Sequence, residues 1–222
     1  GQTTFSMSMN MTETVYTGST FATVSYIDIT NMTISMTESG TTVTISLTGS
    51  ESSENKLATP TYKTESTYTG VTFTGTDNTD YTVVDINGYP VTGDMAMTVN
   101  GTVSDKRTES GTVVESSTMS FFNLIVTDQW NNTTGIETTT INGTFSAEMT
   151  PAVPCEEGTY SFVTVQPMVM NMNTGLTTAG ELEINGTVVV TFTSTGAVMV
   201  SINGGTPVSY TDAELAAMCA TI

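Results

Sequence analysis

The residues able to do chemistry are few, and most of them are acidic. The chain has 222 residues, with 22 aspartates and glutamates, four lysines and arginines, and no histidine. Without histidine, catalytic triads and the common zinc sites are excluded. Serine and threonine are plentiful, but a hydroxyl nucleophile needs an activating base beside it. We therefore expect a protein that is not an enzyme and has no catalytic residues.

One acidic stretch has the composition of a calcium site. The sequence GTDNTDY, residues 75–81, carries Asp77, Asn78 and Asp80. Carboxylate and amide oxygens are the ligands that Ca²⁺ prefers. The closing glutamate of an EF-hand is missing, so a turn in which these oxygens accept backbone N–H bonds is the alternative. Calcium is the single cofactor candidate, and no other cofactor is expected.

Paired carboxylates offer the remaining route to catalysis. Glu181 and Glu183 are spaced to share one face of a strand, and two carboxylates can support glycoside hydrolysis. They would lie on the face that carries threonine, where solvated surface charge is the competing interpretation. An acid hydrolase is therefore the last of the three functions considered.

The two cysteines, Cys155 and Cys219, are far apart in the sequence. In an acidic, threonine-rich chain of the kind found outside cells, this pair predicts a disulfide. Closing so long a loop would stabilise the fold by roughly 4 kcal/mol in the chain-entropy model. Two buried free thiols are the alternative.

The net charge of −18 limits which binding partners and which cellular location we expect. Such a chain is repelled by nucleic acids and by anionic lipids, so neither is expected as a partner. No run of about twenty apolar residues is present, so insertion into a membrane is not expected. We expect an extracellular or cell-surface location, with the periplasm as the alternative.

Strand patterns fill almost the whole chain, and strands are expected around Tyr68–Phe73 and Tyr81–Ile86 among others. Apolar residues occupy every second position in many segments, and threonine, which favours strands, is the dominant residue. The run FFNLIV, residues 121–126, is apolar without interruption and predicts a strand buried on both faces. The fold class expected is all-β: a single domain, mainly an antiparallel meander, forming a sandwich or a curled barrel-like sheet. A short helix is expected over residues 210–220, with Thr211 as its N-cap.

The dipeptide Asn-Gly occurs five times. It usually marks a two-residue hairpin turn. For Gly101, Gly143 and Gly186, however, the alternation of apolar residues continues unbroken across the dipeptide, so these glycines are predicted to lie within straight strands. Asn87-Gly88 and Asn203-Gly204 are predicted to be turns.

The opening strand raises the question of what it pairs with. Phe5, Met7, Met9, Met11 and Val15 alternate from almost the first residue. Residues 1–17 are interpreted as an N-terminal strand able to act as a donor strand, and residues 18–222 as the all-β domain. Pairing inside its own sheet and pairing with a groove in the next subunit are both open.

The function expected is a non-enzymatic extracellular structural protein, a fibre or cell-surface assembly subunit joined to copies of itself by strand exchange. The alternative is an exported β-sandwich module that binds a glycan or an apolar ligand, with Trp130, Tyr160 and Phe162 as candidate lining residues or as core. The 14 methionines are interpreted as core packing or as an adaptable surface for a partner or ligand.

Overall fold

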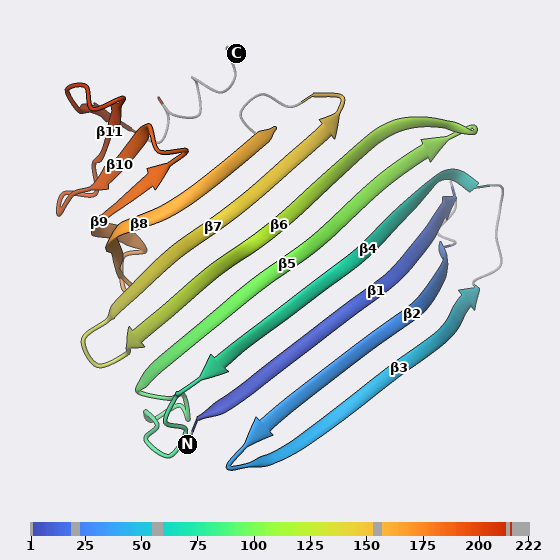
Figure 1. Ribbon diagram of the computed structural model, residues 1–222, viewed down its shortest axis with the longest axis horizontal. Coiled ribbons are helices and arrows are strands. Elements are labelled where there is room, and N and C mark those ends of the chain that lie inside the picture. The colour runs from blue at the N-terminus through green and yellow to red at the C-terminus, as the bar shows by residue number, and fades with distance from the viewer. Residues whose placement is uncertain (1, 19–22, 55–59, 153–156, 212–213, 215–222) are drawn as a thin grey trace.

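The chain folds into one open antiparallel sheet. The computed structural model describes residues 2–18, 23–54, 60–152, 157–211 and 214. These residues form a twelve-stranded sheet in the order β12-β11-β10-β9-β8-β7-β6-β5-β4-β1-β2-β3 (Figure 1). The expected all-β class is confirmed, and of the two architectures expected the structure has the curled sheet, which does not close.

The strands in the first half of the sheet are long, and those at its far end are short. Their bounds are β1 Thr3–Gly18, β2 Thr23–Glu38, β3 Thr41–Glu54, β4 Pro60–Asp77, β5 Thr92–Glu109, β6 Thr112–Asn131, β7 Ile136–Thr150, β8 Gly158–Asn171, β9 Leu176–Ile184, β10 Val188–Phe192, β11 Val198–Ile202 and β12 Val208–Tyr210.

The opening strand lies inside the sheet. β1 pairs with β2 on one side and with β4 on the other, both antiparallel and along nearly its whole length. The first four strands therefore have the spatial order β4-β1-β2-β3, which is a Greek key, and β4 to β12 continue as a meander. The backbone hydrogen bonds of residues 3–17 are thus made within the chain.

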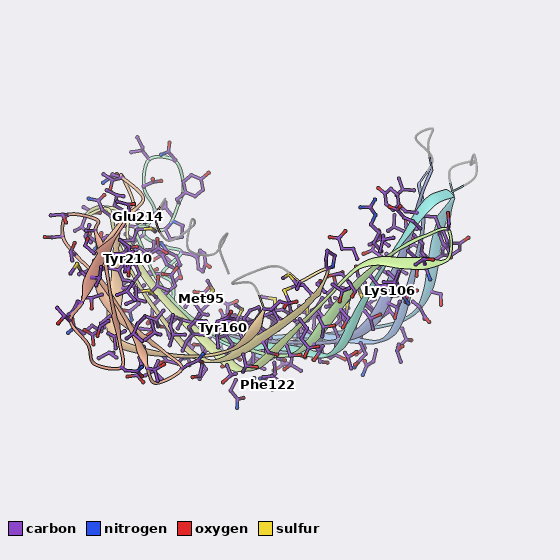
Figure 2. The ribbon with its side chains drawn as sticks, turned by 90° about the horizontal axis from the view of Figure 1, so that it is seen from above. Met95, Lys106, Phe122, Tyr160, Tyr210 and Glu214 are labelled. Atoms are coloured by element: carbon purple, nitrogen blue, oxygen red, sulfur yellow. The ribbon has the colours of Figure 1, made fainter. Side chains whose placement is uncertain are left out.

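A row of irregularities crosses the middle of the sheet and bends it. The register shifts at Met9/Met11 between β1 and β4, at Thr69/Thr72 between β4 and β5, and near Phe122 and Asn123 between β6 and its neighbours. Each shift inserts extra residues into one strand, which increases twist and curvature. Figure 2 shows the result, a sheet curled into a half-pipe with one concave and one convex face.

Asparagine side chains complete the hydrogen bonding along this row. The Oδ1 atoms of Asn10, Asn100 and Asn142 accept the backbone N–H groups of Gly70, Asn123 and Thr164 at 2.7, 2.7 and 2.9 Å. Each asparagine thereby satisfies a donor that the shifted ladder leaves without a backbone partner.

Gly101 and Gly143 lie within β5 and β7, as predicted. Gly143 has a φ of 119°, and a Cβ added there would lie 2.1 Å from the carbonyl oxygen of Asn123, so the bulge of β6 requires glycine at this position.

The prediction for Gly186 was wrong, because this glycine lies in the turn between β9 and β10. Val188 pairs directly with Ile184, so the connecting loop has three residues. An odd loop keeps Ile184 and Val188 on one face, whereas the two-residue hairpin rejected on sequence grounds would not.

Two further expectations also differ from the structure. FFNLIV forms the middle of β6, but it is not buried on both faces, since Phe122 is 55% exposed and Ile125 is 40% exposed. The segment Tyr81–Ile86, which was expected to be a strand, is instead a loop with a single isolated bridge, Val84 to Pro90.

At the C-terminal end, Thr211 Oγ1 accepts the Glu214 backbone N–H at 3.3 Å, while the Glu214 carboxylate accepts the Thr211 N–H at 2.7 Å. This is the reciprocal pattern of a helix N-cap; most of the expected helix lies outside the described residues.

The two faces of the sheet differ in chemistry. Residues directly opposite each other in neighbouring strands share a face. On the convex face, hydroxyl groups pair across strands, as in Ser35–Thr44 at 2.9 Å, Thr102–Ser120 at 3.0 Å and Thr127–Thr140 at 2.6 Å. The concave face carries the apolar positions of the alternating pattern.

Candidate functional site

The concave face forms an apolar trough, and this is the candidate site. We use "trough" for the concave side of β1 and β4–β8. Pairing places on it Met7, Met9, Phe73, Met97, Val99, Val126, Ile141, Phe121, Phe145, Tyr160 and Phe162. In Figure 2, Met95 and Tyr160 lie on this side, and Phe122 points away from it.

No second layer covers the trough among the residues described. In that part of the chain only Val71, Val99 and Ala147 are buried hydrophobic residues. The molecule exposes 13255 Å² in total, against roughly 9,700 Å² for a compact protein of its mass. The excess of about 3,500 Å² of accessible surface shows that the chain is much less compact than a globular protein of its mass. The apolar residues of the trough therefore lie on one side of a single layer, with no described layer packed against them.

Methionine dominates this face. Eleven of the 14 methionines are on the concave side of the whole sheet: Met7, Met9, Met11, Met32, Met36, Met95, Met97, Met119, Met149, Met168 and Met170. Unbranched, polarisable side chains adapt to irregular contacts and are frequent on surfaces that bind several partners. Of the two interpretations considered from the sequence, the adaptable surface fits this placement.

Aromatic rings lie on the trough floor. The rings of Phe121 and Phe145 are 5.5 Å apart, and those of Tyr160 and Phe162 are stacked at 6.4 Å. Trp130 lies among the last residues of β6, at one end of the trough, and packs against Gly93. A Cβ added to Gly93 would lie only 1.9 Å from the indole. The three aromatic residues singled out as candidate lining, Trp130, Tyr160 and Phe162, thus share one face.

One end of the trough carries a polar hollow of about 390 Å³. Arg107 lies over the ring of Tyr62, 4.7 Å from its centroid, and contacts the carboxylates of Glu109 at 2.5 Å and Glu115 at 3.7 Å. Asp105 accepts a hydrogen bond from Ser66 at 2.5 Å. The guanidinium is held by an aromatic face and two carboxylates, so this end is polar but not strongly cationic.

The other end carries two neighbouring carboxylates. Burial raises the pKa of Glu137, and the negative charge of Asp128 beside it raises that pKa further. Thr139 donates a hydrogen bond to Asp128 at 3.2 Å. Sequence reasoning missed this pair because the two residues lie on different strands, and only the register of β6 on β7 brings them together. Glu181 and Glu183, the pair considered from the sequence, alternate with Leu182 and Ile184 and so lie on the convex face.

The calcium candidates are occupied by local hydrogen bonds. Asp77 accepts the Thr79 N–H at 2.8 Å and the Tyr81 hydroxyl at 2.6 Å, and Asp80 accepts the Thr82 N–H at 2.9 Å. Asn78 binds the Asp94 carbonyl through its backbone N–H at 2.8 Å. These are the side-chain turns considered as the alternative. The described residues contain no group of three or more Asp, Glu, His or Cys placed to hold a metal. Calcium binding at Asp77, Asn78 and Asp80 stays untested, and the local hydrogen bonds favour the turn interpretation.

The remaining predicted residues are the two cysteines and the apolar residues of the opening strand. Cys155 and Cys219 lie outside the described residues, so the disulfide stays a prediction. Phe5, Met7, Met9, Met11 and Val15 face the concave side of β1, whose two edges are paired within the chain.

A loop that sequence reasoning took for a strand exposes apolar side chains beyond the trough. Between β4 and β5, Tyr81 is 64% exposed, Tyr89 67% and Ile86 100%. Turns at Asp80 and Asp85 hold the loop, since each carboxylate accepts the backbone N–H two residues on. The sequence suggested a strand here because the turns are set by side-chain hydrogen bonds of Asp80 and Asp85, which the spacing of apolar residues does not reveal.

Within the described part of the chain, no helix is long and apolar enough to cross a membrane. Comparisons of the chain with family models, with curated proteins and with solved structures gave no match.

Proposed function

We propose that the protein is a non-enzymatic extracellular binding module that holds the acyl chain of a neutral amphiphile in its trough. The observation that carries the proposal is a single concave apolar face that no described residue covers. Apolar area of this extent is unfavourable in water and must be covered by something.

The shape of the trough favours a flexible ligand over a second protein surface. Two concave faces brought together would touch at their rims and enclose a hollow. The convex face of another copy carries rows of hydroxyl groups, with only scattered exposed apolar residues such as Phe122 and Ile125. Flexible acyl chains can fill a curved surface lined by methionine. Along β5 the apolar positions run from Met95 to Val103, a span of about 27 Å at the usual strand rise. One acyl layer of a bilayer needs roughly half of the ~30 Å hydrocarbon core.

The charge of the protein selects the headgroup. With a net charge of −18, an anionic amphiphile would be repelled on approach. The hollow around Tyr62 and Arg107 offers hydroxyl, aromatic and charged groups to a neutral polar headgroup.

The test uses Trp130, the one tryptophan of the chain, as a reporter. Addition of 1-monooleoylglycerol is expected to shift its emission to the blue and to raise the Tm, because the ligand binds only the folded state. Met97→Asp places a charge in the trough and should weaken binding at least tenfold. Ile125→Asp places the same charge on the convex face and should leave binding unchanged. No spectral shift and no rise in Tm for the unmodified chain would sink the proposal.

A structural subunit that assembles with copies of itself is the second candidate function. Strand exchange through residues 3–17 would have to release two complete ladders, one to β2 and one to β4. The observation that favours self-association lies elsewhere, at the outer edge of β3.

A further inference from the structure

The outer edge of β3 is long and unpaired. β3 is the last strand on its side of the sheet, and no described strand follows it. Every residue from 41 to 51 is exposed, which is unusual for a strand whose side chains alternate between two faces. Val43 is 59% exposed, Ile45 52% and Leu47 45%, although all three belong to the concave face.

Nothing in residues 41–50 of this edge protects it from pairing. Natural edge strands are shortened, charged, bulged or interrupted by proline. The opposite edge of the sheet follows that rule, since β12 spans only Val208–Tyr210. β3 has neither charge nor proline from Thr41 to Ser50, and its apolar and hydroxyl residues alternate regularly up to Leu47. The sheet therefore has one long edge that is open to pairing, at β3, and one short edge, at β12.

We propose that two copies of this chain pair antiparallel through β3, around a twofold axis at Ile45. In that register Ile45 faces its own copy, and Val43 faces Leu47 of the second chain. Three apolar cross-strand pairs then form on the concave side, each of the kind that stabilises antiparallel strands. This inference gives the second candidate function a partner and a geometry, and it stands apart from acyl binding.

Charge distribution fixes the orientation and the register. Glu51 and Glu54 lie at one end of β3, and its first ten residues are uncharged. Antiparallel pairing centred on Ile45 places the two acidic ends at opposite ends of the contact. Parallel pairing, or a centre near Ser50, would bring the glutamates of both copies together, and like charges facing each other across strands are destabilising.

The expected assembly is closed. A contact in which the same surface is used by both copies satisfies itself and ends with the dimer, whereas a filament needs two different complementary surfaces. The short β12 edge offers no match for a fourteen-residue strand. Because the axis runs perpendicular to the sheet, the concave faces of both copies lie on the same side and form one continuous surface, in which β2 and β3 of the two copies lie between the troughs.

Sedimentation velocity over a range of protein concentrations tests the dimer. The unmodified chain should show a concentration-dependent monomer–dimer equilibrium. Ile45→Lys sets two ammonium groups against each other at the axis and should weaken the dimer at least tenfold. Met36→Lys is the matched control, since Met36 is 53% exposed on the same face of β2 and is not at the edge; it should leave the equilibrium unchanged. A chain that stays monomeric, or that forms larger species, overturns the proposal.

Cross-linking tests the register. Ile45→Cys should give a disulfide-linked dimer on mild oxidation beyond any formed by the unmodified chain, because directly opposed strand residues lie within disulfide range. Thr41→Cys should not, since each Thr41 would face Gly49 of the other chain; cross-linking of Thr41→Cys alone would overturn the register. The Trp130 titration with 1-monooleoylglycerol, repeated on Ile45→Lys, shows whether acyl binding survives without the dimer, so the two proposals can fail separately.

Discussion

At the scale of single residues, the asparagines of the bulge row act as acceptors for a displaced backbone. Asn142 Oδ1 accepts the Thr164 N–H at 2.9 Å, and Thr164 Oγ1 in turn donates to the Ile141 carbonyl at 2.7 Å. The glycine that follows each such asparagine in β5 and β7 lets the neighbouring strand approach. The recurrent Asn-Gly motif thus encodes a bend within a strand, in two of its copies.

Asn142→Ala should destabilise the fold by about 1 to 3 kcal/mol, because the part-buried Thr164 N–H loses its partner. Urea unfolding followed by far-UV circular dichroism measures the change. Asn87→Ala is the control, since the Asn87 side chain makes only a 3.4 Å contact with Asp85 on an exposed loop. Equal effects of the two substitutions would show that the bulge row does not depend on its side-chain acceptors.

Glu137 should make stability depend on pH in the direction opposite to most carboxylates. Burial and the charge of Asp128 raise its folded-state pKa above the ordinary 4.5. Between the ordinary pKa and the raised one, the folded state binds more protons than the unfolded state, so the free energy of unfolding falls as the pH rises through that window. The destabilisation is complete above the folded-state pKa and absent below the ordinary value.

Glu137→Gln should therefore have a higher Tm than the unmodified chain at pH 7, and the difference should shrink as the pH is lowered towards 4. Differential scanning calorimetry from pH 4 to 8 measures it. Removing any acidic charge from so acidic a chain gives a general gain, and Glu148→Gln, an exposed position on the convex face, supplies that baseline. The same pH profile for both variants would contradict the specific role of Glu137.

At the scale of elements, we expect side chains in the middle of the sheet to contribute most to the free energy of unfolding. Val71 of β4 is 2% exposed and lies against the row of bulges, whereas Val163 of β8 is 49% exposed on the convex face. Val71→Ala should cost about 2 kcal/mol through lost apolar burial and the small cavity left behind. Val163→Ala should change stability by no more than about 0.5 kcal/mol. Urea unfolding of both variants checks the contrast, and a large effect at Val163 would mean that something covers the convex face.

The positions of the strands follow from the sequence more readily than the pairing between strands does. Two-residue alternation located most strands, and unbroken phase placed Gly101 and Gly143 inside β5 and β7. The same phase argument failed at Gly186, because a three-residue loop and a straight strand preserve the same alternation. The strand prediction for Tyr81–Ile86 failed for a different reason, since side-chain hydrogen bonds of Asp80 and Asp85 turn the chain there and the spacing of apolar residues does not show them.

The site depended on information that no local pattern contains. Trp130, Tyr160 and Phe162 could be named from their types, but their common face follows from the registers of β6, β7 and β8. The pairs Asp128–Glu137 and Tyr62–Arg107 each join two strands and leave no local signal. The uncovered concave face was equally invisible, because alternating residues predict which side is apolar and not whether a second layer covers it.

At the scale of the whole molecule, a large negative charge and a large apolar face are combined on one thin sheet. The charge opposes contact between copies at low salt, and the proposed contact between two copies uses the uncharged start of β3. Raising NaCl from 0.01 to 0.5 M shortens the Debye length from about 30 Å to a few ångströms. Repulsion among the acidic residues should weaken, and the Tm of the chain should rise by several degrees.

A parallel titration with divalent salts separates the screening of charge from specific calcium binding. CaCl₂ and MgCl₂ at equal ionic strength should raise the Tm by the same amount, because the carboxylates of Asp77 and Asp80 already accept hydrogen bonds from Thr79, Tyr81 and Thr82. Asp80→Asn should respond to both salts as the unmodified chain does. An extra rise that only CaCl₂ produces, and that Asp80→Asn removes, would contradict this expectation and establish the loop as a calcium site. The contrast between two divalent cations matters, since both screen the −18 charge equally and only a built site of oxygen ligands can tell them apart.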